Sequence, residues 1–310
     1  MVELPAHAKD AAPYPTKPIK LISPSTPGSP GDLVARVFSD RLAAALGQPV
    51  LVENRPGATG IIGLGAVAQS APDGYTLGVM SMPHVVVPSI VSKMPYDTEK
   101  DLAPVALVNW NYNVLAVPAG SRLNSLADII AAAKAKPGAI KYSSGGNGTP
   151  SHLVGELLRR DARVDMTHVP YKGGTAAVLA AVSGEVDFCV GAIGPLSPQV
   201  KSGKLRALAT SSPHRIAAYP ELPTFVELGY PGVQIRDWQG FVAPARTPAS
   251  VIARLHAEIA KIAAQPEVKQ RIESLGLEPA AMGPKEFEAH IQNEFRKWGK
   301  LVRDVGIKAD

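Results

Sequence analysis

Three segments of the sequence share a pattern that suits the binding of a small anion. In each segment a short apolar strand leads into a loop rich in Gly, Pro, Ser and Thr, and the loop opens a helix; the loops cover residues 23–31, 53–60 and 143–151. A helix N-terminus offers free backbone N–H groups and a partial positive charge to an anion. Because the first and third loops lie in different halves of the chain, the pattern predicts a cleft that holds an anion from both sides.

The order of helix and strand signals predicts an α/β protein of two domains. The chain has 310 residues, which is too long for one ordinary core. Apolar strand signals alternate with amphipathic helix signals, an arrangement typical of largely parallel sheets. The clearest helices are expected at 32–46, 126–136, 152–160, 175–183, 249–264, 267–275 and 285–305, and strands at 75–79, 114–117, 167–169, 186–190, 207–209 and 240–242.

The chain is expected to cross twice between these domains. Residues 212–231 are rich in Pro and Gly, have no strong period, and are expected to wrap the surface before the chain returns to the first domain. Covering the N-terminal sheet is the simplest role for the C-terminal helices. We therefore predict that residues 1–115 and 235–310 form domain 1 and residues 116–234 form domain 2, with the two crossings acting as a hinge.

Composition excludes several other classes of protein. The net charge is +5, but Lys and Arg are scattered among acidic residues and no basic run alternates with aromatic residues, so nucleic acid is not an expected partner. No apolar run reaches the roughly 20 residues of a membrane span. The single cysteine, Cys189, excludes an internal disulfide and lies in an apolar stretch typical of a buried strand.

Catalytic and metal-binding signatures are missing from the sequence. It contains no G-x-S-x-G, G-x-x-x-x-G-K-[ST] or H-E-x-x-H motif, and residues 145–148 do not match G-x-G-x-x-G. No His, Asp and Glu cluster has the spacing of metal ligands, so neither a metal nor a cofactor is expected. The sequence favours a binding protein over an enzyme.

The N-terminus carries a feature that bears on localisation. Residues 5–13 resemble a small-residue cleavage site and its polar sequel, yet no basic or apolar region of a signal peptide precedes them. We expect that an export signal has been removed from this chain. The alternative is a cytoplasmic protein that senses a ligand and passes its closed state to a regulatory partner.

Six segments of the chain resemble the Bug family, the extracytoplasmic solute receptors of tripartite tricarboxylate transporters. The resemblance covers nearly the whole chain after residue 13, in order and at similar spacing, and rests on residues 14–19, 52–60, 71–77, 146–149, 168–173 and 203–208. It implies a periplasmic receptor with the two-domain Venus flytrap fold of periplasmic binding proteins. It further implies that the domains close on a small carboxylate, and that the closed form is offered to membrane transporter subunits.

The resemblance also implies which loops hold the ligand, largely through backbone amides and ordered water. The glycines among them would let N–H groups approach closely, although each glycine alone is equally well a turn residue. The implied residues are Ser25, Thr26, Gly28 and Ser29 in the first loop, and Ser144, Gly145, Gly146, Asn147, Gly148 and Thr149 in the opposing loop.

The first loop departs from the family pattern. The family shows an aromatic residue and a Pro-Gly-Gly run there, whereas this chain has Ser25 and the run Pro27-Gly28-Ser29-Pro30-Gly31. The small Ser25 leaves room that an aromatic residue would fill. This argues against the small dicarboxylates usual for the family, and it favours a larger ligand, an aromatic or an extended dicarboxylic acid, over an amino acid.

Several other residues are candidates for the site, each with a structural alternative. His84 follows a strand and either projects into the cleft, where its titration near pH 6.5 would change affinity, or lies in a surface loop. Asp32 is expected to bind loop amides rather than ligand. The remaining candidates lie before a predicted helix or at the end of a predicted strand, and the structural alternative for them is a turn. They are Tyr171, Lys172, Gly173 and Ala192.

Overall fold

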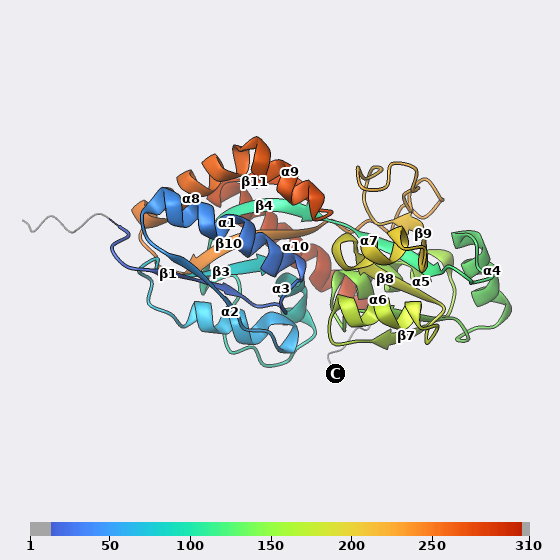
Figure 1. The fold of residues 1–310 in the computed structure, drawn as a ribbon. Helices are drawn as coiled ribbons and strands as arrows, with labels where there is room; N and C mark the ends of the chain where they lie inside the picture. Colours follow the sequence, from blue (N-terminus) through green and yellow to red (C-terminus); the bar gives the residue numbers. More distant parts are fainter. Residues whose placement is uncertain (1–13, 306–310) are drawn as a thin grey trace, which may run out of the picture.

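The alternating strand and helix signals build two lobes, each organised around one sheet (Figure 1). The computed structural model describes residues 14–305. The sheet of the first lobe has the strand order β11-β4-β10-β3-β1-β2, and that of the second lobe β7-β6-β8-β5-β9. The strands of the first sheet are β1 (Ile19–Ser23), β2 (Val50–Asn54), β3 (Thr76–Ser81), β4 (Leu102–Asn111), β10 (Asp237–Pro244) and β11 (Glu278–Met282). Those of the second are β5 (Asn113–Pro118), β6 (Lys141–Ser144), β7 (Thr167–Pro170), β8 (Phe188–Ala192) and β9 (Leu205–Thr210).

Both sheets are mixed, which corrects the expectation of mostly parallel strands. Parallel pairing is confined to β1 with β2 and β3, and to β6 with β7 and β8. The strands β4, β5, β9, β10 and β11 pair antiparallel with their neighbours. The physical reason is the double crossing, because the chain leaves the first lobe along β4 and β5 and returns in the opposite direction along β10.

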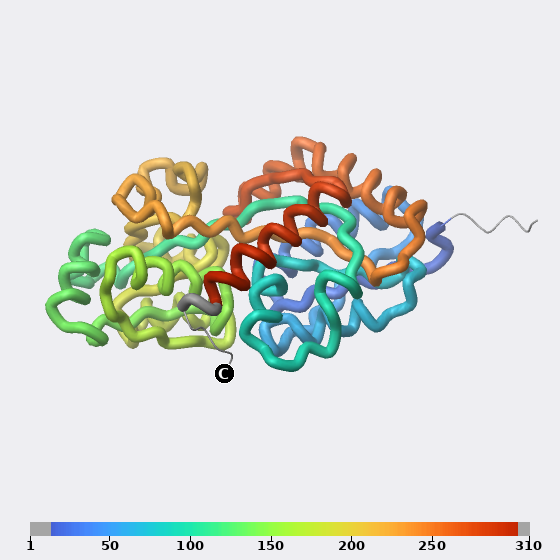
Figure 2. Tube along the Cα trace, turned by 180° about the vertical axis from the view of Figure 1, so that it is seen from behind, coloured from blue at the N-terminus to red at the C-terminus, as the bar shows by residue number. Residues whose placement is uncertain are grey.

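Helices cover both faces of the first sheet. One face packs against α1 (Pro30–Leu46), α8 (Ala249–Ala264) and α9 (Pro266–Ser274). The other face is covered by α2 (Ile61–Ala68), α3 (Pro83–Val86) and α10 (Pro284–Val305), with the short helices η1 (Ala58–Gly60) and η2 (Val87–Ser89) beside them. The long amphipathic α10 crosses this face toward the second lobe (Figure 2), so the C-terminal helices cover the N-terminal sheet as predicted.

The second sheet is also covered on both faces, by α4 (Leu126–Ala135), α5 (Pro150–Ala162), α6 (Gly174–Val182) and α7 (Ile193–Lys201). Successive residues of β6 show the two faces directly. The Tyr142 ring meets Gly155 of α5, whereas the Ser143 hydroxyl donates to the Ala177 carbonyl of α6 at 2.7 Å. A capping box of Ser125 and Asp128 fixes the start of α4.

Sequence signals placed most elements to within two residues but missed the helices α3 and α7 and the strands β4 and β11. Helix α8 has the predicted bounds, and α1 starts two residues early because Pro30 suits a first helical position. Helix α7 was missed because Pro195, Pro198 and a glycine gave it the composition of a loop. The irregular segment 212–231 lies over the second lobe as expected, anchored by the buried side chains of Ile216, Leu222 and Phe225.

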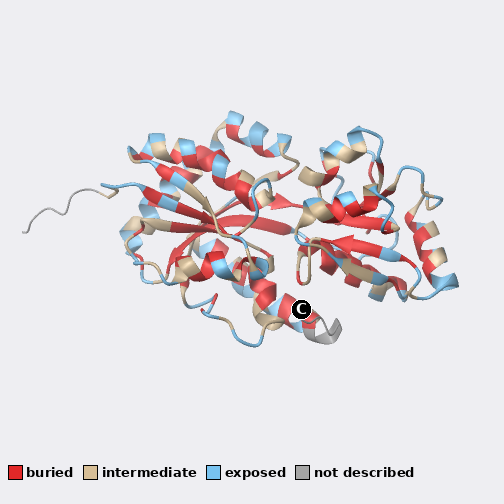
Figure 3. Ribbon diagram, turned by 60° about the horizontal axis from the view of Figure 1, so that its bottom comes forward, coloured by how far each residue is buried: buried red, intermediate tan, exposed pale blue. Residues whose placement is uncertain are grey.

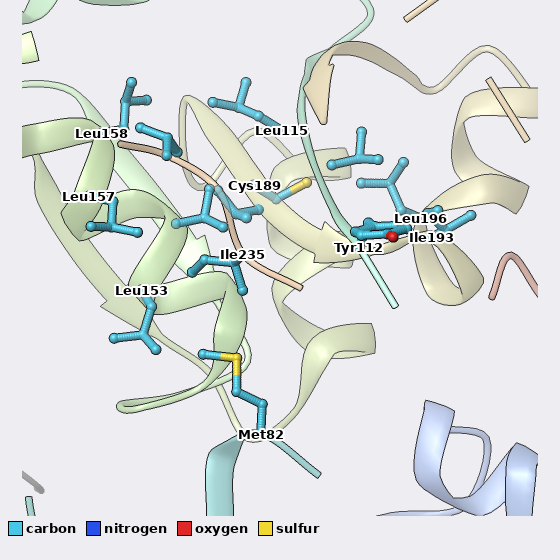
Figure 4. Packing of buried hydrophobic residues seen from close by; sticks show 14 of the residues in the cluster. Met82, Tyr112, Leu115, Leu153, Leu157, Leu158, Cys189, Ile193, Leu196 and Ile235 are labelled. Carbon is cyan, nitrogen blue, oxygen red and sulfur yellow. The ribbon is translucent and has the colours of Figure 1, made fainter. Parts of the chain in front are cut away.

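The predicted division at residues 115 and 235 stays a prediction, and its first boundary falls within β5. The two lobes share one apolar cluster. The inner strands of both sheets are mostly buried, whereas the edge strands β2, β7 and β11 are largely partly exposed (Figure 3). Met82 extends from the end of β3 toward Leu153 of α5 (Figure 4), and both side chains are fully buried. The core is therefore continuous across the junction of the lobes.

Tryptophan and histidine rings fasten α10 to the crossing strands. Trp110 of β4 and Trp238 of β10 each meet the His290 ring edge to face, at centroid distances of 5.4 and 5.5 Å. Arg236 lies over Trp110 at 3.9 Å. Both tryptophans are thus packing residues of the crossing.

None of the helices in the described part of the chain is long and apolar enough to span a membrane. Within residues 14–305, no group of three or more His, Cys, Asp or Glu side chains is arranged to hold a metal ion. The cleavage-site resemblance at residues 5–13 lies outside the described residues.

Cys189 supplies a test of the second lobe. It lies in β8, between β6 and β5, with no exposed surface, and burial raises the pKa of its thiol to about 12. Because the thiolate is the reactive form, we expect a disulfide reagent at mildly alkaline pH to leave the native protein unlabelled while labelling the guanidinium-unfolded protein completely. Rapid labelling of the native protein would contradict this placement of β8.

Candidate ligand-binding site

The first loop, residues 24–29, is held by the buried carboxylate of Asp32. One oxygen accepts the Gly28 N–H at 2.9 Å, the other accepts the Asn54 amide at 2.8 Å, and both accept the Arg36 guanidinium. Burial opposes ionisation, but the hydrogen bonds from Arg36, Gly28 and Asn54 outweigh it and lower the pKa of Asp32. Asp32 therefore binds a loop amide, as the sequence predicted.

Hydrogen bonds within the loop close it into a turn. The Ser29 hydroxyl donates to the Thr26 carbonyl at 2.7 Å, and Asn54 donates to the Ser25 carbonyl at 3.1 Å. Gly28 has a left-handed φ of 79°, which suits glycine. A Cβ placed on Gly31 would lie 3.1 Å from the Ser25 hydroxyl, so Ser25 packs closely on the first turn of α1.

The loop that opposes the first one comprises residues 145–149 and is called the second loop from here on. Side chains of the same lobe accept hydrogen bonds from its glycine N–H groups. The N–H groups of Gly145, Gly146 and Gly148 donate to Ser151 Oγ, Ser144 Oγ and His152 Nδ1, at 3.1, 3.2 and 3.2 Å. Thr149 caps α5 and donates to the Gly146 carbonyl at 2.6 Å. These three glycine N–H groups therefore have partners within their own lobe, and the contact with a ligand that the resemblance implies for these residues stays a prediction.

The N-terminus of α6 is the point at which the two loops meet. Gly173 donates to the Gly145 carbonyl at 3.2 Å, and Tyr171 donates to the Ser144 carbonyl at 3.0 Å. From the opposite lobe, the Thr26 hydroxyl lies 4.0 Å from the position of a Cβ on Gly173. The structure thus brings both predicted loops and the predicted Gly173 together.

The lobes also touch beside this point. A Cβ on Gly148 would lie 2.7 Å from Cδ1 of Ile90 and 3.7 Å from Cγ1 of Val86, both in the first lobe. Gly148 has a left-handed φ of 73°. Close approach to the other lobe and backbone conformation therefore both favour glycine here.

His84 is neither a surface residue nor free to titrate near pH 6.5. Its ring is 4% exposed and accepts the Ser81 N–H at Nδ1, at 2.9 Å. Its Nε2 points at Gly60, where a Cβ would collide with it. Burial lowers the pKa of His84 to about 4.

The other candidates lie around the loops. Lys172 is exposed and precedes α6, and Asn147 is partly exposed within the second loop. Ala192 ends β8 directly before α7 and pairs with Asn113 of the crossing strand. The first turn of α7 lies near that of α6, since Pro195 is 3.8 Å from the position of a Cβ on Gly174.

The sequence reasoning missed the residues that support the loops. Asn54 lies in one of the segments that resemble the Bug family, but no local pattern indicates its role, because only the fold brings it to Ser25 and Asp32. His168 contacts the Ser144 hydroxyl at 2.6 Å, although 24 residues separate them. Periodicity cannot reveal such partners, because parallel strand pairing brings them together.

A polar cluster lies where the chain crosses between lobes. Asn111 donates to Asp237 at 3.1 Å, and Gln239 donates to the same carboxylate oxygen at 3.2 Å. Burial raises the pKa of Asp237 to about 6, against the hydrogen bonds it accepts.

Comparison with known proteins identifies the family. The model described as "Tripartite tricarboxylate transporter family receptor" matches residues 34–307, a span that includes the second loop but starts after the first. The chain belongs to this family. Membership confirms the resemblance to Bug proteins and the expectation of a receptor and not an enzyme.

Named relatives agree with this assignment. The chain is 36% identical to protein BugT of Bordetella pertussis, over 95% of this chain and 91% of BugT. Among solved structures, the periplasmic binding protein BugD is 29% identical with a TM-score of 0.87, covering 96% of this chain and 100% of BugD. This match confirms the predicted two-lobed fold class.

Two further structures contain carboxylates. An R. palustris protein with adipate is 28% identical, with a TM-score of 0.90 over 96% of this chain and 100% of that protein. MatC from Rhodopseudomonas palustris with bound malate is 30% identical, with a TM-score of 0.84 over 93% of this chain and 100% of MatC.

The low pKa of His84 makes folding sensitive to acid. Between pH 6.5 and 4 the unfolded chain binds a proton at this residue that the folded protein does not, so acidification favours unfolding. We expect wild type to lose about 2 kcal/mol more unfolding free energy than His84→Asn between about pH 7.5 and 5. Urea titrations of both proteins at the two pH values measure this.

The asparagine variant is a matched comparison, because its side-chain oxygen can still accept the Ser81 N–H. Equal losses in the two proteins would show that His84 is accessible to protons in the folded state.

Proposed function

We propose that this protein is a periplasmic receptor that binds a small carboxylate, either a dicarboxylate or an aromatic carboxylate, between its two lobes. It delivers the ligand to the membrane subunits of a tripartite tricarboxylate transporter and works as a monomer. The geometric observation that carries the proposal is the meeting of both loops at the N-terminus of α6, where Thr26 of one lobe faces Gly173 of the other. The family membership and the malate and adipate in related structures support the ligand class.

The donors for the carboxylate come from both lobes. The first-turn N–H groups of α1 and α6 have no partner within their own helices, and the two helix dipoles favour an anion between them. The exposed Thr26 hydroxyl adds a donor, and the exposed Lys172 attracts anions to this edge of the second lobe. The glycine amides of the second loop contribute shape, because side chains already hold them.

Ligand binding is coupled to the arrangement of the lobes. A carboxylate that contacts both lobes binds the closed arrangement more tightly than any open one, and so increases its population. The crossing strands carry Trp110 and Trp238, so this change should alter tryptophan emission.

A titration with chosen acids tests the function. We expect malate, adipate or benzoate to raise the melting temperature of the protein. A ligand present at a free concentration of 100 times its Kd adds about 2.7 kcal/mol to the free energy of unfolding. Amino acids and sugars serve as controls. Absence of a shift and of any calorimetric heat with every acid would reject the carboxylate receptor.

Thr26→Val tests the place of the ligand without changing side-chain volume. Loss of a hydroxyl that donates to a charged ligand should weaken binding about tenfold, measured by calorimetry with the acid that binds best. Thr167→Val is the matched control, because Thr167 is exposed at the start of β7, which is the end of the strand remote from the loops. This substitution should change affinity less than twofold. Equal affinities of wild type and Thr26→Val would remove Thr26 from the site.

Ser25→Phe tests the size of the ligand. If the small Ser25 leaves room for an extended acid, filling that room should weaken adipate by about tenfold or more, and malate less. Ser202→Phe, on the exposed end of α7, controls for an added aromatic ring. An equal loss for both acids would show that Ser25 does not set ligand length.

A further inference from the structure

A column of four rings lies beneath the second loop. Phe188 of β8 stacks on Tyr142 of β6 at 5.4 Å, Tyr142 meets His168 of β7 at 4.9 Å, and His168 stacks on His152 of α5 at 4.0 Å with an angle of 13° between the rings. The column starts in the core, where Phe188 and Tyr142 have no exposed surface. It ends at the loop, because His152 lies within the first turn of α5.

His152 connects the end of the column to the loop backbone. Its Nδ1 accepts the Gly148 N–H at 3.2 Å, so this nitrogen carries no proton and the ring proton lies on Nε2. That nitrogen is 3.8 Å from a Glu156 oxygen, which itself accepts from the Tyr142 hydroxyl at 2.8 Å and from Arg159 at 2.9 Å. Burial, reinforced by the charge of Arg159, lowers the pKa of His152 to about 4 and keeps the acceptor available.

His168 makes the second connection, through Ser144. Its Nε2 lies 2.6 Å from the Ser144 hydroxyl oxygen, which also accepts the Gly146 N–H at 3.2 Å. The Ser144 hydroxyl also lies 3.3 Å from the Gly146 carbonyl oxygen, and whether its one proton goes to that oxygen or to the imidazole, its own oxygen keeps a lone pair for the Gly146 N–H. The two stacked rings therefore fix the amides of Gly146 and Gly148, whose φ angles are 121° and 73°.

We propose that His152 and His168 are positioning residues, which hold the second loop in its ligand-ready shape before any ligand arrives. The shape matters because Gly148 meets Ile90 and Val86 of the other lobe, while Gly145 meets the start of α6. A loop fixed in advance loses no conformational freedom when the lobes close on a ligand, which strengthens binding. The effect on affinity rests on the proposed function, whereas the effect on the loop does not.

Two substitutions of His152 separate the acceptor from the ring. His152→Asn retains an acceptor at the position of Nδ1 but no stacking ring, and His152→Phe retains a ring but no acceptor. The first readout is amide hydrogen exchange of Gly148 in the ligand-free protein, followed by NMR. Because a phenylalanine ring cannot accept the Gly148 N–H, we expect exchange of Gly148 to be about five- to tenfold faster in His152→Phe and near wild type in His152→Asn.

The same experiment on His168 keeps the proposal falsifiable if a His152 variant does not fold. His168→Gln retains a polar atom near the position of Nε2, whereas His168→Phe does not. Gly146 exchange should be faster in the phenylalanine variant and restored by glutamine. Wild-type exchange at both glycines in both phenylalanine variants would overturn the proposal.

The second readout is affinity for malate and adipate. We expect about three- to tenfold weaker binding in each phenylalanine variant and recovery in His152→Asn and His168→Gln. Faster exchange with unchanged affinity would overturn the role of the preset loop in binding. If neither acid binds wild type, the proposed ligand fails, while the exchange rates still decide whether the histidines position the loop.

Discussion

A loop that faces a ligand must satisfy its own backbone polar groups while the ligand is away, and this constraint shapes both loops of the proposed site. In the first lobe, the Asp32 carboxylate accepts the Gly28 N–H and the Asn54 amide donates to the Ser25 carbonyl. In the second lobe, three glycine N–H groups donate to the side chains of Ser144, Ser151 and His152. Both loops therefore satisfy these backbone groups from within the protein, through hydrogen bonds that engage the Gly28 N–H and three glycine N–H groups of the second loop.

The remaining donors lie at helix ends, where the backbone geometry leaves N–H groups unpaired. Their convergence depends on the parallel parts of the two sheets, since β1, β6, β7 and β8 all end toward the junction of the lobes. The antiparallel strands β4, β5 and β10 have a different role, because they carry the chain across the junction and back. Closure of such a site requires contacts that differ between arrangements of the lobes. In the arrangement described here, Gly148 lies against Ile90 of the other lobe.

The shared apolar cluster affects the free energy of the proposed closure. Met82, Val86 and Leu153 are fully buried where the lobes meet, so an open arrangement must expose apolar surface. Under the proposed function, a ligand that contacts both lobes and the burial of this apolar surface both favour the closed arrangement. The rings of Trp110 and Trp238 contact His290 of α10. These contacts connect the crossing strands to the helix that covers one face of the first sheet.

The sequence by itself determined the alternation of strands and helices, the two loops at Ser25 and Gly145, the role of Asp32 and the family resemblance. Each of these depends on neighbours close in the chain, such as Pro30 at the start of α1 or Ser125 capping α4. Only the tertiary structure decided the mixed strand directions, the burial of His84, and the partners of the glycine amides. His168 reaches Ser144 through strand pairing, and Gly148 reaches Ile90 across the lobes, because contacts between residues distant in the chain leave no periodic signal in the sequence.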